Sequence, residues 1–335
     1  KNVKSVIVPH TNGRKGLSVA VAAGACIGDA GAQLEVLANV TPAQLEQLDD
    51  YLGRVEIAVL RSPLRCPFDI QVRVLAGADE AYVHIVGSHT NVVRVEKNGK
   101  VLRDQPYSEE AAQPPENRRL LTVENIIAFA DEVDLDDVRA PIARQIAYNT
   151  AIAEAGLTGK YGAAIGKILL SSYGESVQNR AKAWAAAGSD ARMNGCEKPV
   201  VINSGSGNQG ITASVPVWRY GLFMGASEEK ILRAVALSDL ITIHQKTGIG
   251  RLSAYCGAVS AGVGAGCGIA WLRGADYDIG TGILGYNMYL GGNNFRPGDG
   301  IEGADVEDTI RNVGILASKG MHETDRVILN IMTGR

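Results

Sequence analysis

Apolar and polar residues alternate over short stretches in the first hundred positions, a pattern typical of strands and short helices. Val3–Val8 is a β-branched run, whereas Leu17–Ile27 is rich in alanine and helical in character. Four further short apolar runs favour strands: Val55–Leu60, Ile70–Leu75, Tyr82–Val86 and Val92–Leu102. The last run contains Asn98-Gly99, a pair that indicates a tight hairpin turn. This part of the chain predicts a mixed α/β domain.

The apolar spacing becomes helical farther along the chain. Residues 123–130 place Val, Ile, Ile and Ala at i, i+3, i+4 and i+7, which is one face of a helix. Similar stretches cover residues 142–155, 163–171, 177–187, 227–240 and 306–332. The segment from Asp104 to Arg119 is rich in Gln, Glu and Pro, which favours an exposed connection. We therefore expect two domains, 1–118 and 119–335.

Leu252–Leu272 is the longest uncharged segment of the chain. It is long enough to cross a bilayer, but its glycines, alanines and serines make it too weakly apolar for a membrane span. We expect it to form a buried helix of a soluble protein. The fold class is thus predicted to be α+β: an N-terminal mixed α/β domain, followed by a predominantly helical domain with a buried Gly/Ala-rich helix.

The composition narrows the classes of function and partner. The 335 residues include 33 Lys and Arg against 36 Asp and Glu, so no cationic surplus favours nucleic-acid binding. The five cysteines form no CxxC pair: Cys26, Cys66, Cys196, Cys256 and Cys267. With no signal peptide visible near Lys1, this favours a reducing, cytoplasmic compartment. The oligomeric state is open, although Gly- and Ala-rich helices that pack closely are compatible with a homodimer.

The glycine-rich segment Ser204–Gly210 is a candidate binding loop that follows the apolar run Val200–Ile202. It contains a formal G-x-G-x-x-G, but a dinucleotide fold needs a βαβ unit, and the next segment is helical in pattern. Two interpretations remain. The segment is either a turn that starts a helix, or a site where backbone N–H groups hold a carboxylate or phosphate. The side-chain donors of such a site are Ser204, Ser206, Asn208 and Gln209.

Two loops of the first domain have a similar character. Pro9–Gly16 lies between a predicted strand and a predicted helix, so its hydroxyl, amide and ammonium groups are placed to bind a small anion. Gly87–Asn91 interrupts an apolar strand, and its His89 is a candidate base because imidazole exchanges protons near neutral pH. A plain turn at the end of a strand is the alternative for His89.

Two cysteines lie eleven residues apart in the uncharged segment, Cys256 and Cys267. At 1.5 Å per residue a continuous helix separates them by roughly 16 Å, so they cannot bind one metal centre. One of them is expected to be a small core residue. His244 completes no zinc-binding spacing with Cys256. Ser189–Arg192 fits a polar loop or a ligand clamp equally well.

Seven blocks occur in a fixed order along the chain: Val8–Gly16, Leu34–Leu37, Gly87–Asn91, Ser189–Met193, Ser204–Ile211, Ser253–Gly257 and Gly320–Asp325. In this order they resemble the L-cysteine desulfidase family, which is related to the iron–sulfur L-serine dehydratases. The resemblance implies a pyridoxal-independent lyase whose [4Fe–4S] cluster is held by three Cys thiolates, with one iron open as a Lewis acid. A base removes the α-proton of an L-amino acid, the β-substituent leaves, and the enamine hydrolyses to pyruvate and ammonia. The leaving group is sulfide from L-cysteine or water from L-serine.

The resemblance also implies roles for individual residues. Cys256 resembles a cluster ligand, and His89 resembles the position that bears the base in the related serine dehydratases. Cys267 is left as a core residue. The residues that would bind the small L-amino acid substrate, through its carboxylate and amino group, are Thr11, Asn12, Lys15, Ser88, Thr90, Asn91, Ser204, Ser206, Gly207, Asn208 and Gln209.

The sequence departs from the family pattern in its cysteines. Members of the family carry a Gly-Cys-Thr-Glu-Pro segment before Lys1, and a Cys-Asp-Gly-Ala block that this chain lacks between Trp271 and Asn287. A single thiolate cannot hold a four-iron cluster. The protein is therefore either a cluster-free amino-acid-binding relative, or one whose cluster-binding segments are missing from this sequence. We favour the second, because the flanking motifs are intact and a cluster-binding loop can disorder when its metal is lost.

Overall fold

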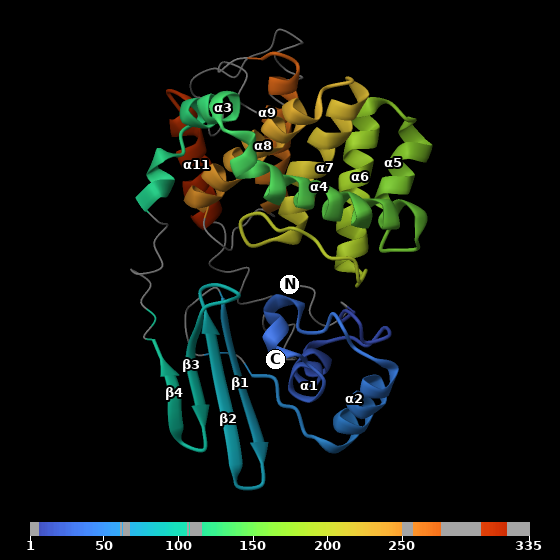
Figure 1. Cartoon of the computed structure of the whole chain (residues 1–335), viewed down its shortest axis with the longest axis vertical. Coiled ribbons are helices and arrows are strands. Elements are labelled where there is room, and N and C mark those ends of the chain that lie inside the picture. The colour runs from blue at the N-terminus through green and yellow to red at the C-terminus, as the bar shows by residue number, and fades with distance from the viewer. Residues whose placement is uncertain are drawn as a thin grey trace. The chain divides into compact units, whose positions relative to one another are not determined.

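The computed structural model describes residues 7–60, 62, 68–105, 107, 116–249, 257–275 and 303–319. Residues 116 and 316–319 are described by their backbone only. The described residues form two compact units, one up to residue 107 and one from residue 116 onward (Figure 1). The fold class is α+β, as predicted: the first unit joins helices to an antiparallel sheet, and the second is helical.

Short helices open the first unit. α1 spans Leu17–Cys26, a 3-10 helix spans Ala30–Glu35, and α2 spans Pro42–Arg54. Thr41 and Gln44 form a capping box, in which each side chain accepts from the backbone N–H of the other residue. The buried core between α1 and α2 consists of Ala22, Ala23, Ile27 and Leu48. α1 confirms the helix that the alanine-rich segment predicts.

The sheet of the first unit has four described strands: β1 Asp69–Ala76, β2 Asp79–Val86, β3 Val92–Lys97 and β4 Lys100–Asp104. Each strand pairs antiparallel with the next along the chain, in the order β1-β2-β3-β4. Asn98 and Gly99 join β3 to β4 with φ values of 51° and 75°, the left-handed conformation that a tight hairpin turn requires. The predicted hairpin is therefore confirmed.

One predicted strand is wrong. Residues 55–60 follow α2 as an irregular segment. Ile57 packs against the core between α1 and α2 instead of joining the sheet, while Leu60 is exposed. A short apolar run indicates that its residues are buried, but it does not indicate which neighbouring element they pack against. Of the predicted strand Val3–Val8, residues 3–6 lie outside the described part of the chain.

The second unit is a packed set of helices. Its described elements are a 3-10 helix Glu116–Leu120, α3 Val123–Glu132, α4 Leu135–Thr158, α5 Ile165–Tyr173, α6 Val177–Met193, α7 Gly207–Phe223, α8 Glu228–Ile249, α9 Gly257–Leu272 and α11 Val306–Lys319. Thr122, Asp134 and Ser176 cap α3, α4 and α6 by accepting backbone N–H bonds. The helices predicted between residues 123 and 240 are thus confirmed. α11 confirms the predicted stretch 306–332 up to residue 319, and residues 320–332 lie outside the described part of the chain.

The buried Gly/Ala-rich helix is α9. It packs closely against α8, because Gly264 lies against the Ser238 carbonyl and the Thr242 hydroxyl, and Gly268 lies against the Ala234 carbonyl. A side chain at either glycine would collide with α8, so the small residues set the distance between the two helices. The described part of the segment predicted as a buried helix, from Gly257 onward, is confirmed.

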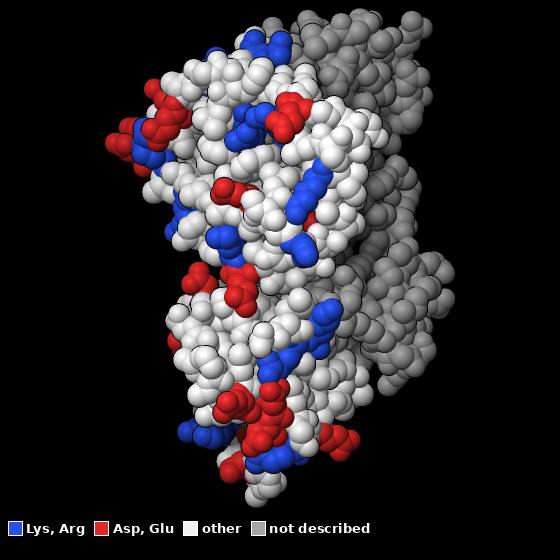
Figure 2. All heavy atoms as spheres, turned by 90° about the vertical axis from the view of Figure 1, so that its right-hand side faces the viewer, with Lys and Arg blue, Asp and Glu red and all other residues white. Residues whose placement is uncertain are grey.

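Two observations concern the surface. Among the described helices, none combines the length and the apolar character that crossing a membrane requires. On the face drawn in Figure 2, basic and acidic residues are interspersed. The described residues of this face therefore form no extended basic patch of the kind that binds nucleic acid.

Candidate functional site

The glycine-rich motif forms a tight turn followed by the start of α7. The Asn203 N–H donates to the Ser206 carbonyl over 3.1 Å, and the Ser206 N–H donates back over 3.0 Å. Ser204 and Gly205 between them have φ values of 48° and 82°, as a two-residue hairpin turn requires. Residues 200–202 form no strand, and α7 is followed directly by α8. A dinucleotide-binding βαβ unit is therefore absent at this motif.

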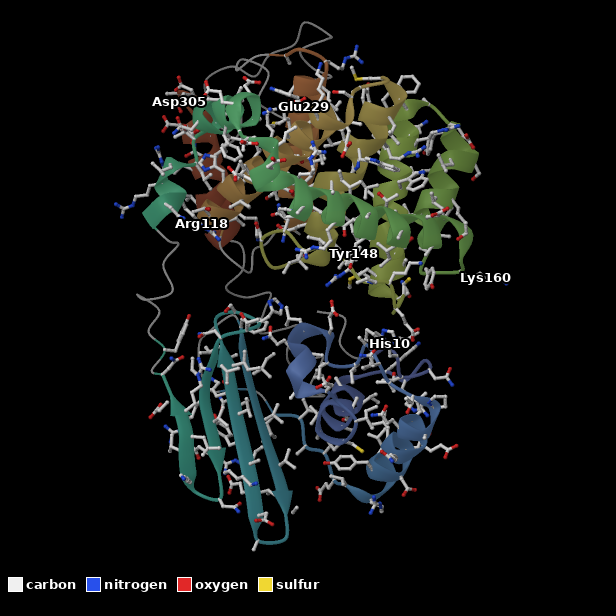
Figure 3. The ribbon with its side chains drawn as sticks, in the orientation of Figure 1. His10, Arg118, Tyr148, Lys160, Glu229 and Asp305 are labelled. Carbon is white, nitrogen blue, oxygen red and sulfur yellow. The ribbon has the colours of Figure 1, made fainter. Side chains whose placement is uncertain are left out.

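Buried amides of α4 hold the approach to this turn. Asn149 donates to the Val201 carbonyl over 3.1 Å and accepts from the Val201 N–H over 2.9 Å, so it replaces a strand partner. Asn149 is fully buried, whereas its neighbour Tyr148 lies at the surface of α4 (Figure 3). One turn earlier, Gln145 donates to Asp239 of α8 over 2.9 Å. Two helices thus fix the backbone that leads into the turn.

Asp239 is the acidic group of this site, and the sequence analysis missed it. Its Oδ1 accepts hydrogen bonds from Gln145 and from Asn203, the latter over 2.8 Å. Burial raises the pKa of Asp239 to about 6, although these two amide donors pull it down. A signal existed in the sequence: in α4, Gln145 and Asn149 occupy positions of the buried stripe that apolar residues take elsewhere. Polar side chains in such a stripe need partners.

Arg192 of α6 is the basic group of the site. Its Nη1 donates to the Asn208 Oδ1 over 3.2 Å, and its side chain lies so close to Gly207 that a Cβ there would collide with it. Burial lowers the pKa of the guanidinium. Among the described residues, no carboxylate forms an ion pair with Arg192. The helix dipole adds further positive potential at this end of α7.

Gln209 in the first turn of α7 is 4% exposed. Its buried Oε1 has no hydrogen-bond partner in the described part of the chain. The amide lies against Gly257, the first residue of α9 and the residue that follows Cys256. Cys256 itself lies outside the described residues. The first turn of α7 therefore contacts Gly257, the residue directly after the predicted metal ligand Cys256.

The Pro9–Gly16 loop belongs to the first unit. Thr11 is buried and its hydroxyl donates to the Val8 carbonyl over 2.6 Å, so it closes the turn. Asn12 and Lys15 are exposed. His10, labelled in Figure 3, and Asn12 both have positive φ, 58° and 52°. The substrate contacts assigned to Thr11, Asn12 and Lys15 stay predictions.

The segment Gly87–Asn91 connects β2 to β3, as the sequence predicts. Asn91 donates from its side chain to the Val86 carbonyl over 2.8 Å and thereby closes the loop. His89 is exposed, and its ring contacts that of Phe68 in a tilted arrangement with a centroid separation of 4.6 Å. Ser88 is half-buried, and Thr90 is exposed. The assignments to His89, Ser88, Thr90 and Asn91 also stay predictions.

The cysteines whose positions the structure describes are Cys26, Cys196 and Cys267. Cys267 is buried in the core between α3 and α8, as expected. In the described part of the chain, no three His, Cys, Asp or Glu side chains gather closely enough to hold a metal ion. These residues do not by themselves fit a [4Fe–4S] cluster.

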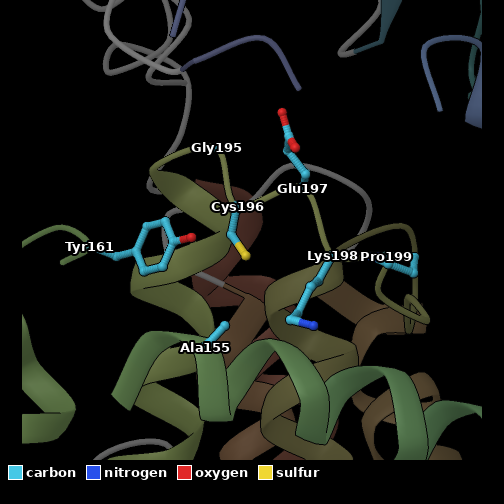
Figure 4. Close-up of a pocket in the computed structure, with 7 residues that line it drawn as sticks. All are labelled: Ala155, Tyr161, Gly195, Cys196, Glu197, Lys198 and Pro199. Carbon is cyan, nitrogen blue, oxygen red and sulfur yellow. The ribbon is translucent and has the colours of Figure 1, made fainter. Parts of the chain in front are cut away.

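A pocket of about 460 Å³ lies where α6 leads into the α7 loop (Figure 4). Its lining residues are Ala155, Tyr161, Gly195, Cys196, Glu197, Lys198 and Pro199. A hydrogen bond with Cys196, together with burial, raises the pKa of Tyr161. The chain passes from this pocket directly into Val200 and the network around Asn149.

Comparison with known proteins places the candidate loop inside a family match. The family described as serine dehydratase alpha chain matches residues 31–282. A UPF0597 protein of Desulfitobacterium hafniense is 45% identical over 364 residues, which cover 99% of this chain and 85% of the relative. UPF0597 proteins of Lachnoclostridium phytofermentans and Treponema denticola are 42% and 39% identical, each over 99% of this chain and over 87% and 86% of the relative. No solved structure matches the chain.

The alignments with these three relatives are 364 to 373 residues long, whereas this chain has 335 residues. The relatives therefore carry internal residues that have no counterpart in this sequence.

Proposed function

Because the chain belongs to the serine dehydratase alpha chain family, we propose that it is a lyase that eliminates the β-substituent of L-cysteine. The Cα–H bond breaks first, and the Cβ–S bond then breaks with departure of sulfide. The enamine takes up water and yields pyruvate and ammonia. L-serine, which would lose water instead of sulfide, is the alternative substrate.

The observation that carries this proposal is the electropositive first turn of α7. Arg192 contributes a half-buried positive charge without a carboxylate partner among the described residues, and the first-turn N–H groups and the helix dipole of α7 add positive potential. An α-carboxylate fits such a site. Binding it there orients the Cα–H bond and withdraws negative charge from the carbon that is deprotonated.

His89 is the proposed base. It is exposed, and its ring contacts Phe68. Ser88, Thr90 and Asn91 beside it, together with Thr11, Asn12 and Lys15, are proposed to contact the substrate. Positioned bases of this kind contribute about 10²- to 10⁴-fold to a rate.

Cys256 is proposed as a thiolate ligand of a [4Fe–4S] cluster. Its place in the chain supports this, since the next residue, Gly257, lies against Gln209 in the first turn of α7. A bound cluster would supply Lewis acidity. The described residues offer no complete ligand set, so the steps above are assigned only to side chains and backbone of this chain.

The test is pyruvate formation from L-cysteine by anaerobically purified protein, without pyridoxal phosphate. We expect wild type and Cys26→Ala to form pyruvate, because Cys26 belongs to α1 and donates only a weak bond to the Gln47 carbonyl. We expect Cys256→Ala to lose iron and pyruvate formation together. Equal turnover by both variants would refute the role of Cys256. Binding of amino acids without pyruvate from either L-cysteine or L-serine would indicate an amino-acid-binding relative.

A further inference from the structure

The loop before α7 joins two charged side chains of opposite sign that the sequence analysis did not assign to it. Arg192 contacts Gly207 and Asn208, the first two residues of α7. Asp239 contacts Asn203, in the loop that directly precedes α7. Only the two-residue turn Ser204–Gly205 and Ser206 separate these contact points in sequence. A cationic and an anionic side chain therefore both contact the short stretch Asn203–Asn208.

Each charge retains capacity to bind a ligand. Asp239 uses Oδ1 for both of its amide donors, and the described residues provide no hydrogen bond to its Oδ2. Arg192 donates to an amide oxygen and to the sulfur of Met193, neither of which neutralises its charge. Both side chains are half-buried, and a partly desolvated charge without a partner is costly, so a ligand of opposite charge would be bound favourably at each.

A second, independent feature points to a ligand at this place. Gln209 is 4% exposed, yet its Oε1 has no partner among the described residues. Buried polar atoms are nearly always hydrogen-bonded, so an orphaned acceptor in the first turn of α7 calls for a donor from a bound molecule. An ammonium group is such a donor. The first-turn N–H groups call for an acceptor, which a carboxylate supplies.

We infer that Arg192 and Asp239 are the two charged anchors of a zwitterionic α-amino acid, with the carboxylate at Arg192 and the ammonium group on the side of Asp239. This inference rests on the proposed function and specifies its substrate class. The site selects molecules that carry both charges on one carbon. It therefore excludes simple carboxylic acids and simple amines, whatever their β-substituent.

Three unreactive ligands separate the two anchors: L-alanine carries both charges, propionate lacks the ammonium group, and ethylamine lacks the carboxylate. Binding is measured calorimetrically on the full-length holoprotein under anaerobic conditions. Charge-assisted hydrogen bonds are strong enough that deleting one anchor should weaken binding about 10- to 100-fold. We expect wild type to bind L-alanine at least tenfold more tightly than either single-charge ligand.

The variants then report on the anchors separately. Arg192→Gln should bind L-alanine as weakly as ethylamine, with ethylamine binding unchanged. Asp239→Asn keeps an acceptor for Gln145 and Asn203, and it should bind L-alanine as weakly as propionate, with propionate binding unchanged. Arg180→Gln is the matched control, because Arg180 lies on α6 as well and forms a surface ion pair with Glu175. It should bind all three ligands as wild type does.

The inference is overturned if either anchor variant binds L-alanine as wild type does. It is also overturned if a variant weakens all three ligands equally, since that result indicates a structural role. Pyruvate formation from L-cysteine, assayed in parallel, keeps the two proposals apart. Selective binding without turnover would overturn the lyase and leave the anchors standing, whereas turnover without charge selectivity would do the reverse.

Discussion

At the scale of single residues, Asp239 is the group whose ionisation the fold controls most clearly. The groups that hydrogen-bond it from α4 and from the α7 loop are neutral amides, Gln145 and Asn203. Burial therefore outweighs their effect and raises the pKa of the carboxyl from 3.8 to about 6. Burial makes the ionised form of this carboxyl unfavourable, so the group either takes up a proton or binds a cation.

This shift predicts how stability depends on pH. The folded state binds the Asp239 proton more tightly than the unfolded state, so the resulting stabilisation is complete below about pH 4 and is lost as the pH rises through about 6. Asp239→Asn has no such proton. Between pH 4 and pH 7 the unfolding free energy of wild type should fall relative to this variant by about 2 kcal/mol. Denaturant titrations at both pH values measure the difference, and a difference that does not change with pH would contradict the assignment.

At the scale of elements, α9 packs closely against two helices: Gly257 at its start contacts Gln209 of α7, and Gly264 lies against α8. The approach depends on particular glycines rather than on glycine content. Gly264 lies against Ser238 and Thr242, whereas a Cβ at Gly262 of the same helix would meet no atom within 4 Å. The two positions form a natural pair for comparison.

Gly264→Ala should destabilise the protein by about 1–3 kcal/mol, because the added methyl group forces α8 and α9 apart. Gly262→Ala should stabilise it by about 0.5–1 kcal/mol, since alanine loses less conformational entropy in a helix. Denaturant unfolding of both variants tests this directly. Equal effects of the two substitutions would show that the helix spacing does not depend on Gly264.

The elements also show what the sequence could and could not reveal. Periodicity located α3 to α6 and α8, the long uncharged segment located α9, and the Asn-Gly pair located the β3–β4 turn, because each signal is local in sequence. No periodic stretch was assigned to α7. The anchoring of the α7 loop depends on Asn149 and Asp239, which are far from it in sequence. No local pattern states that Asn149 takes the place of a strand partner for Val201. The same limit explains why Val55–Leu60 was misassigned as a strand.

At the scale of the whole molecule, the residues assigned to catalysis are distributed over both compact units. His89 and the Pro9–Gly16 loop belong to the first, and Arg192, Asp239 and the α7 loop belong to the second. The family match, residues 31–282, also extends over both. On this account the α-carboxylate and the ammonium group of the amino acid are recognised by charged residues of the second unit, Arg192 and Asp239.

The central claim is that the protein cleaves the Cβ–S bond of L-cysteine. The most direct measurement is carbon-13 NMR of L-cysteine labelled at Cβ, incubated anaerobically with the holoprotein in the absence of pyridoxal phosphate. The account predicts that the label moves to the methyl carbon of pyruvate, with sulfide and ammonia released in equal amounts. Labelled L-cysteine that stays intact would contradict it, and pyruvate formed from L-serine in a parallel sample would then indicate the alternative substrate.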